Sequence, residues 1–152
     1  MKAKIAIVLG SKSDKARLEE GFSLLKAVRI GYTLEIISAH RNPDELRTFC
    51  KYAKRRGIEV IIACAGLAAA LPGFIASYVD IPVIGVPLEG GPLNGFESLV
   101  SIVEVPKGIG LVSTGIGKKG FFNAIIFALR ILACQHKEYQ KALVTVTNKF
   151  KK

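Results

Sequence analysis

The chain has 152 residues, half of them hydrophobic, and its 22 lysines and arginines against 12 acidic residues give a formal net charge of +10. This length suits a single domain, and the apolar content supplies a full core, which argues against a disordered chain. Every apolar run is broken by glycine, proline or a charge before about 18 residues, so no membrane span is expected.

Short apolar segments rich in β-branched residues alternate along the chain with segments of helical period. They predict five strands, at residues 4–9, 34–38, 60–65, 82–87 and 109–114. The segments between them predict helices at residues 12–28, 43–56, 71–78, 96–105 and 119–134. Because a run such as VIIACA is apolar on both faces, it suits a parallel strand with helices on either side. The expected fold is an α/β three-layer sandwich around a parallel sheet, with right-handed crossovers.

The segment after Gln135 has a different pattern. Its apolar residues recur at spacings of four, three and four, which places them in one stripe on an otherwise polar helix. They are Tyr139, Leu143, Val146 and Phe150. We therefore expect one catalytic domain over residues 1–135 and a basic amphipathic helix or tail over residues 136–152. The pattern leaves open whether this helix packs on its own domain or on a neighbouring subunit.

The positive charge is scattered, with small clusters only at residues 54–56 and 148–152. No aromatic residues alternate with the basic ones, as a base-stacking surface requires, so we expect no nucleic-acid partner. Scattered charge suits solubility or the attraction of small anions. Three widely spaced cysteines form no CxxC pair, and residues 1–14 lack the cleavage site of a signal peptide. Both features predict a cytoplasmic protein with reduced thiols.

In an open parallel sheet, ligands bind beyond the carboxyl ends of the strands, so the loops there are the candidate site. The first loop is GSKSD, residues 10–14. Ser11 and Ser13 offer hydroxyls and backbone N–H groups at a helix start, which suits an anion. Asp14 would repel a phosphate and is better placed to accept hydrogen bonds from ribose hydroxyls. On this motif alone, simple helix capping by either serine stays an open alternative.

The second loop, SAHRNP at residues 38–43, holds the only histidine of the first 135 residues. Histidine is the side chain that titrates nearest neutrality, so His40 is a candidate proton carrier. Arg41 offers the planar fork that binds phosphate or carboxylate. Asn42 and Pro43, followed by Glu45, predict a helix start with a capping box. The alternative is a hydrogen-bonded structural histidine beside a surface arginine.

Two further loops follow the third and fourth strands. In AGLAAALPG, residues 65–73, small side chains let a ligand approach the backbone, although a tight helix–sheet contact also needs them. VPLEGGPLNG, residues 86–95, is either a wall of the site or, as we favour here, an ordinary exposed loop. No metal-ligand spacing is present. The set of groups suits proton transfer on a phosphorylated, ribose-bearing small molecule.

Six blocks of this sequence resemble the phosphoribosylaminoimidazole carboxylase catalytic subunit, a family also called N5-carboxyaminoimidazole ribonucleotide mutase, of purine biosynthesis. They are GSKSD (10–14), SAHR-x-P (38–43), AGLAAALPG (65–73), PVIGVP (82–87), LNGFESLVSIVEVPKGIG (93–110) and GKKGFFNA (117–124). The blocks cover nearly the whole chain except the basic tail. The resemblance implies a flavodoxin-like fold, a homo-octamer with sites at subunit interfaces, and chemistry without a metal or organic cofactor.

The resemblance also implies residue roles and a reaction. His40 would be the acid/base that releases the N5 carboxyl group as carbon dioxide, the intermediate, and then removes the C4 proton after recarboxylation. The first loop and Arg41 would bind the phosphate, Asp14 would bind the ribose, and the third loop would hold the carbon dioxide. The substrate-binding set so implied is Ser11, Ser13, Asp14, Ser38, Arg41, Gly66 and Ala68.

The chain departs from the family motif AGGAAHLPG at two positions, where it has Leu67 and Ala70. The imidazole that would face the site at position 70 is therefore missing. A mutase that tolerates Ala70 is the favoured interpretation, because SAHR rather than SAHK stands at residues 38–41. Two alternatives stay open: a carboxylase acting directly on 5-aminoimidazole ribonucleotide with free carbon dioxide, and a non-catalytic nucleotide-binding paralogue.

Overall fold

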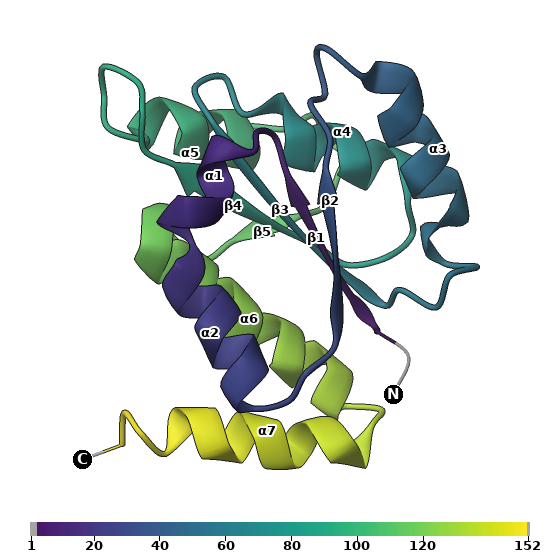
Figure 1. Cartoon of the computed structure of the whole chain (residues 1–152). Coiled ribbons are helices and arrows are strands. Elements are labelled where there is room, and N and C mark those ends of the chain that lie inside the picture. The colour runs from purple at the N-terminus through teal and green to yellow at the C-terminus, as the bar shows by residue number, and fades with distance from the viewer. Residues whose placement is uncertain (1–2, 152) are drawn as a thin grey trace.

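Five parallel strands form one sheet at the centre of the molecule (Figure 1), in a computed structural model that describes residues 3–151. The order of the strands across the sheet is β2-β1-β3-β4-β5. All four neighbouring pairs are parallel. In chain order the strands are β1 Ile5–Leu9, β2 Tyr32–Ile36, β3 Val60–Gly66, β4 Val83–Leu88 and β5 Val112–Ser113.

Helices cover both faces of this sheet, which confirms the predicted three-layer α/β class (Figure 1). One layer contains α1 (Ser13–Arg17), α2 (Glu19–Ala27) and α6 (Gly117–Ala133). The other contains α3 (Pro43–Ala53), α4 (Ala70–Tyr78) and α5 (Phe96–Val103). A last helix, α7 (Lys137–Thr147), lies below α2 and α6. No helix within residues 3–151 is long and apolar enough to cross a membrane.

The central strands are buried on both faces and divide their side chains between two cores. Ile5, Ile7 and Leu9 of β1 pack with α2 and α6, whereas Ala6 and Val8 pack on the opposite side with α3 and α4. This two-sided burial is what the continuous apolar runs predicted, because a strand between two helical layers has no polar face.

Several element boundaries differ by a few residues from the prediction, and two elements differ most. The helix expected at 12–28 is divided at Leu18, whose backbone leaves helical geometry (φ −108°, ψ 11°) while its side chain is buried in the core. The strand expected at 109–114 shrinks to Val112–Ser113. Gly108 and Gly115 on either side have positive φ values of 100° and 115°. Backbone of that geometry cannot continue a strand, so the two glycines bound the segment in which this edge strand can form.

The C-terminal helix α7 packs on α6 of its own chain. Tyr139, Ala142 and Val146 are buried in the same core cluster as α2 and α6. Leu143 is partly buried against this cluster, and Phe150 lies beyond the end of the helix and is 65% exposed. The apolar stripe predicted for the tail thus faces its own domain for most of its length.

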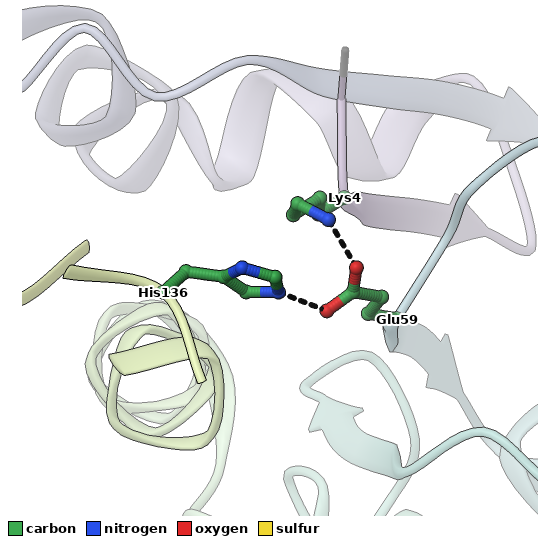
Figure 2. Close-up of polar contacts among 3 residues, drawn as sticks. All are labelled: Lys4, Glu59 and His136. Carbon is green, nitrogen blue, oxygen red and sulfur yellow. Dashed lines mark hydrogen bonds and ion pairs between the residues drawn. The ribbon is translucent and has the colours of Figure 1, made fainter. Parts of the chain in front are cut away.

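A polar cluster fixes the start of α7 to the sheet (Figure 2). The Nε2 atom of His136, just before α7, lies 2.6 Å from Oε2 of Glu59, and Lys4 Nζ pairs with the other carboxylate oxygen. Partial burial acts to raise the pKa of Glu59, but the hydrogen bonds and charges of Lys4 and His136 outweigh it and hold that pKa below its ordinary value. The cluster ties together the starts of β1, β3 and α7.

Replacing Glu59 by glutamine tests this cluster. Since the pKa of Glu59 is lower in the folded chain than in the unfolded one, its carboxylate stabilises the fold above the unfolded pKa, and this contribution is lost as pH falls through the folded pKa. Glu59→Gln should lower the free energy of unfolding at pH 7 by about 1 kcal/mol, the scale of two partly exposed pairs. At a pH below the folded pKa of Glu59, the variant and the wild type should converge. Urea unfolding at both pH values measures this.

The matched control is Glu104→Gln, which changes an exposed glutamate at the end of α5. Its stability relative to the wild type should not show the same loss at pH 7. Equal stability of wild type and Glu59→Gln at pH 7 would contradict the role given to the cluster.

Candidate functional site

A hollow of about 480 Å³ opens at the carboxyl ends of β1, β2, β3 and β4. The loops after these four strands line it, which is the edge where ligands of such sheets bind. The structure brings all eight predicted site residues to this one hollow: Ser11, Ser13, Asp14, Ser38, His40, Arg41, Gly66 and Ala68.

The first loop presents two hydroxyls side by side. The Oγ atoms of Ser11 and Ser13 are 2.9 Å apart, and the Ser13 N–H points to Ser11 Oγ at 3.4 Å. The N-cap residue of α1 is Lys12, and no side chain caps this helix. The serine hydroxyls are therefore not used as the helix cap. Their position leaves them available to a ligand in the hollow.

Asp14 follows on α1 and is half-buried at the same hollow. Burial raises its pKa above the ordinary value, while the charge of Arg17 and a backbone hydrogen bond with Ser11 act in the opposite direction. A carboxylate in this setting is a strong acceptor for hydroxyl groups, because burial has removed part of its water.

The second loop turns sharply between β2 and α3. The Asn42 N–H donates to the Ser38 carbonyl at 2.9 Å, and the Arg41 N–H points to Ser38 Oγ at 3.3 Å. This turn leaves His40 and the Arg41 side chain exposed at the rim of the hollow. Within residues 3–151 the ring of His40 has no hydrogen-bond partner, whereas His136 pairs with Glu59.

The predicted start of α3 is confirmed, but the predicted capping box does not form. Asn42 is the N-cap residue and Pro43 the first helical residue, yet no side chain caps the helix. Glu45 is exposed. The first turn of α3 therefore leaves its N–H groups to the solvent, and the loop is shaped by the Ser38 contacts instead.

The third loop begins at Gly66, the last residue of β3. A Cβ added at Gly66 would lie 3.4 Å from the Leu88 carbonyl oxygen, so the backbone here passes close to the end of β4. Leu67 has a left-handed backbone, with φ of 55°, and its side chain is 58% exposed. The Leu67 carbonyl accepts a hydrogen bond of 2.8 Å from the buried Ser98 hydroxyl on α5.

Sequence reasoning missed Arg17, Glu89 and Gly90 as lining residues. Arg17 Nη1 donates to the Glu89 carbonyl oxygen at 2.7 Å, which joins α1 to the loop after β4. The start of that loop is thus a wall of the hollow, the alternative that the sequence analysis did not favour, although Glu89 and Gly90 are exposed, as are residues 92–94. Arg17 lies three residues after Asp14, and this helical spacing could have identified it.

The AIR carboxylase family model matches residues 4–152 of this chain. The chain belongs to this family. The N5-carboxyaminoimidazole ribonucleotide mutase of Saccharolobus solfataricus is 46% identical over 135 residues, covering 89% of this chain and 84% of that protein. The mutase of Escherichia coli is 44% identical over 141 residues, covering 93% and 83%.

Among solved structures, Treponema denticola PurE superposes with a TM-score of 0.81 at 27% identity, over 95% of this chain and 89% of that chain. The resemblance drawn from the six motifs is therefore confirmed, as is the expected fold. Two residues of the third loop, Leu67 and Ala70, still distinguish this AIR carboxylase family member from the motif AGGAAHLPG.

The left-handed backbone at Leu67 explains why the family motif has glycine there. Leu67→Gly should leave the free energy of unfolding unchanged or raise it by up to about 1 kcal/mol, because relieving the left-handed strain outweighs the flexibility that glycine adds to the unfolded chain. Ala68→Gly, one residue on and without a left-handed backbone, should instead lower it by about 0.5–1 kcal/mol. Urea unfolding measures both, and equal losses in the two variants would contradict the strain.

Proposed function

We propose that this chain is an N5-carboxyaminoimidazole ribonucleotide mutase, which moves a carboxyl group from N5 to C4 of the imidazole during purine biosynthesis. The observation that carries the proposal is the gathering of His40, the two serines of the first loop and the small-residue loop around one hollow. The identity of 46% to a mutase over 89% of the chain supports the same reaction.

In this proposal the phosphate of the ribonucleotide binds Ser11, Ser13 and Arg41. The two hydroxyls lie 2.9 Å apart, so they can donate to neighbouring phosphate oxygens. Within the described residues 3–151, Arg41 makes a hydrogen bond only through its backbone N–H, and its guanidinium is available to pair with the phosphate charge. The half-buried Asp14 accepts hydrogen bonds from the ribose hydroxyls, and Ser38 lines the hollow between them.

The reaction needs one proton donor and one proton acceptor, and His40 serves as both. Protonated His40 gives its proton to N5 as the N–C bond breaks, which releases carbon dioxide and leaves 5-aminoimidazole ribonucleotide. Gly66 and Ala68 hold the gas close to C4, which attacks it. Neutral His40 then removes the C4 proton and restores the aromatic ring. Each step leaves the histidine in the protonation state that the other requires.

Retention of the gas depends on excluding water, which would compete for the freed carboxyl group. The third loop supplies only hydrocarbon side chains between Leu67 and Leu71, so it offers water no side-chain partner. No cofactor enters this sequence of steps.

Ala70 favours a second candidate function, direct carboxylation of 5-aminoimidazole ribonucleotide by free carbon dioxide. Ala70 lines the hollow and brings no titratable group where the family motif has histidine. If that imidazole serves only to retain the substrate's own carboxyl group, its loss would allow exchange with dissolved gas.

We also propose that the protein assembles as a homo-octamer with sites at the subunit interfaces. The outer face of α5 supports self-association, because Phe96, Val100 and Val103 recur at spacings of four and three and are all exposed. Exposed apolar side chains that line up on one face of a helix are typical of a protein contact. Light scattering at several concentrations would test the assembly.

We further propose that the protein acts in the cytoplasm. Its three cysteines are free, and burial raises the pKa of Cys50 to about 11. A thiol of this kind is a core residue rather than a redox group.

An isotope experiment tests the proposed reaction. The protein is given N5-carboxyaminoimidazole ribonucleotide in buffer that contains labelled bicarbonate, and the C4-carboxylated product is analysed early. Unlabelled product is expected, because the carboxyl group stays in the hollow. Labelled product, with equal rates from 5-aminoimidazole ribonucleotide and bicarbonate, would establish the carboxylase instead. Absence of product at any enzyme concentration would indicate a non-catalytic paralogue.

Replacing the histidine of the second loop should abolish the proton transfers. His40→Asn is expected to lower kcat by about 10²–10⁴-fold while retaining affinity for the ribonucleotide, because the loss of a general acid/base removes contributions of this size. The control is His136→Asn, which should keep kcat within about twofold of the wild type. His136 pairs with Glu59 at the opposite end of the strands from the hollow. Near-normal turnover in His40→Asn would refute the assignment.

Removing Arg17 should weaken substrate binding more than it slows turnover. Arg17→Met removes the bond to the Glu89 carbonyl and a positive charge beside Asp14, so KM should rise by about tenfold, the equivalent of one charge-assisted hydrogen bond. The control is Arg47→Met, which should leave KM unchanged. Arg47 is exposed on α3 and does not line the hollow. An unchanged KM in Arg17→Met would show that Arg17 only lines the hollow. Steady-state kinetics of the three proteins decide this.

A further inference from the structure

A second hollow, of about 690 Å³, lies on the outer side of α6 beside the end of α7. It shares no lining residue with the site at the strand ends. Its volume is in the range of pockets that bind small molecules, about 300–1,000 Å³. We call it the α6–α7 hollow, and it is lined by Glu20, Lys118, Lys119, Phe122, Asn123, Ile126, Arg130, Thr147, Phe150 and Lys151.

The charge of this hollow is strongly positive. Four of its lining side chains are cationic, and only Glu20 is acidic. Over residues 3–151, none of these four cations has a carboxylate within 4.0 Å. Lys118 and Lys119 lie in the first turn of α6, where the backbone N–H groups add to the positive potential. The charge therefore suits an anion, held most strongly at the start of α6.

The apolar part of the hollow includes a pair of aromatic rings. The rings of Phe122 and Phe150 meet edge to face, with centroids 5.6 Å apart and an angle of 81°. Phe150 is 65% exposed although it ends the stripe that buries Val146. A flat aromatic ring placed on this pair would cover apolar surface that the fold leaves open. The amide of Asn123 lies in the same hollow and has both donor and acceptor groups for the edge of such a ring.

From the cation cluster and the open aromatic pair together, we propose that the α6–α7 hollow binds a nucleoside phosphate at a site distinct from the catalytic one. The phosphate lies against Lys118 and Lys119, and the base stacks on the exposed ring of Phe150 and contacts Phe122, whose ring stands nearly perpendicular to it. A phosphate without an aromatic group would leave the rings exposed, and an uncharged aromatic would leave four cations unpaired. The proposal does not depend on the reaction proposed for the first hollow.

Titration of the protein with adenosine monophosphate, followed by isothermal calorimetry in physiological salt, tests this site. Because the first hollow also suits a ribonucleotide, the titrations are made in an Arg41→Ala background. The Lys118→Gln/Lys119→Gln double variant should bind about tenfold more weakly or worse, since each lost phosphate contact is worth a charge-assisted hydrogen bond. Phe150→Ala should lose about tenfold through the missing stacking contact.

The matched control is Lys137→Gln/Lys141→Gln, which removes the same charge from exposed positions of α7 outside the hollow. Its affinity should stay within about twofold of the parent, because charges beyond a Debye length are screened. Circular dichroism and thermal unfolding confirm that every variant is folded.

Three results would overturn the proposal. The first is equal affinity of the hollow variants and the control. The second is binding of inorganic phosphate as tight as that of adenosine monophosphate, which would mean that the aromatic pair takes no part. The third is a lower oligomer mass by light scattering in the Lys118→Gln/Lys119→Gln or Phe150→Ala proteins without a change in nucleotide affinity, which would identify the hollow as a subunit contact.

Discussion

The candidate site depends on two backbone hydrogen bonds that continue the sheet beyond its strands. The Gly10 N–H donates to the Cys64 carbonyl at 3.1 Å, and the Ile37 N–H donates to the Leu9 carbonyl at 2.9 Å. They hold the starts of the first and second loops in register with the end of β3. Since β1 and β3 are buried on both faces, their ends cannot shift without disturbing two cores at once. The spacing of His40, the serines and Gly66 is therefore set by the core.

The third loop is held by hydrogen bonds to its backbone, which explains how it tolerates leucine at position 67 and alanine at position 70. The hydroxyl of the fully buried Ser98 lies 2.8 Å from the Leu67 carbonyl and 3.2 Å from the Leu88 carbonyl. This contact fixes the loop to the end of β4 through backbone atoms, independently of the side chains at positions 67 and 70. Loss of the histidine at Ala70 removes a functional group while the wall of the hollow stays in place.

The sequence predicted the features that come from burial and local turns. Continuous apolar runs gave β1, β3 and β4, and the pair Asn42-Pro43 gave the start of α3. It could not predict features that depend on distant segments meeting. The first helix is divided at Leu18, whose side chain is buried in the core, and the contact of Arg17 with Glu89 spans 72 positions of the chain. Similarly, only the packed structure shows that Tyr139 and Val146 pack on α6 of the same chain.

The distribution of charge is compatible with the self-association proposed above, despite a net charge of +10. Residues 57–106, which form β3, α4, β4 and α5, contain no lysine or arginine, so all 22 basic residues lie outside this stretch. The exposed apolar stripe of α5 belongs to it. In the proposed assembly, copies that meet through α5 would keep their basic residues away from the contact, and at physiological salt charges beyond about 8 Å are screened. The basic surface around the α6–α7 hollow can then remain exposed to solvent, where anionic ligands reach it.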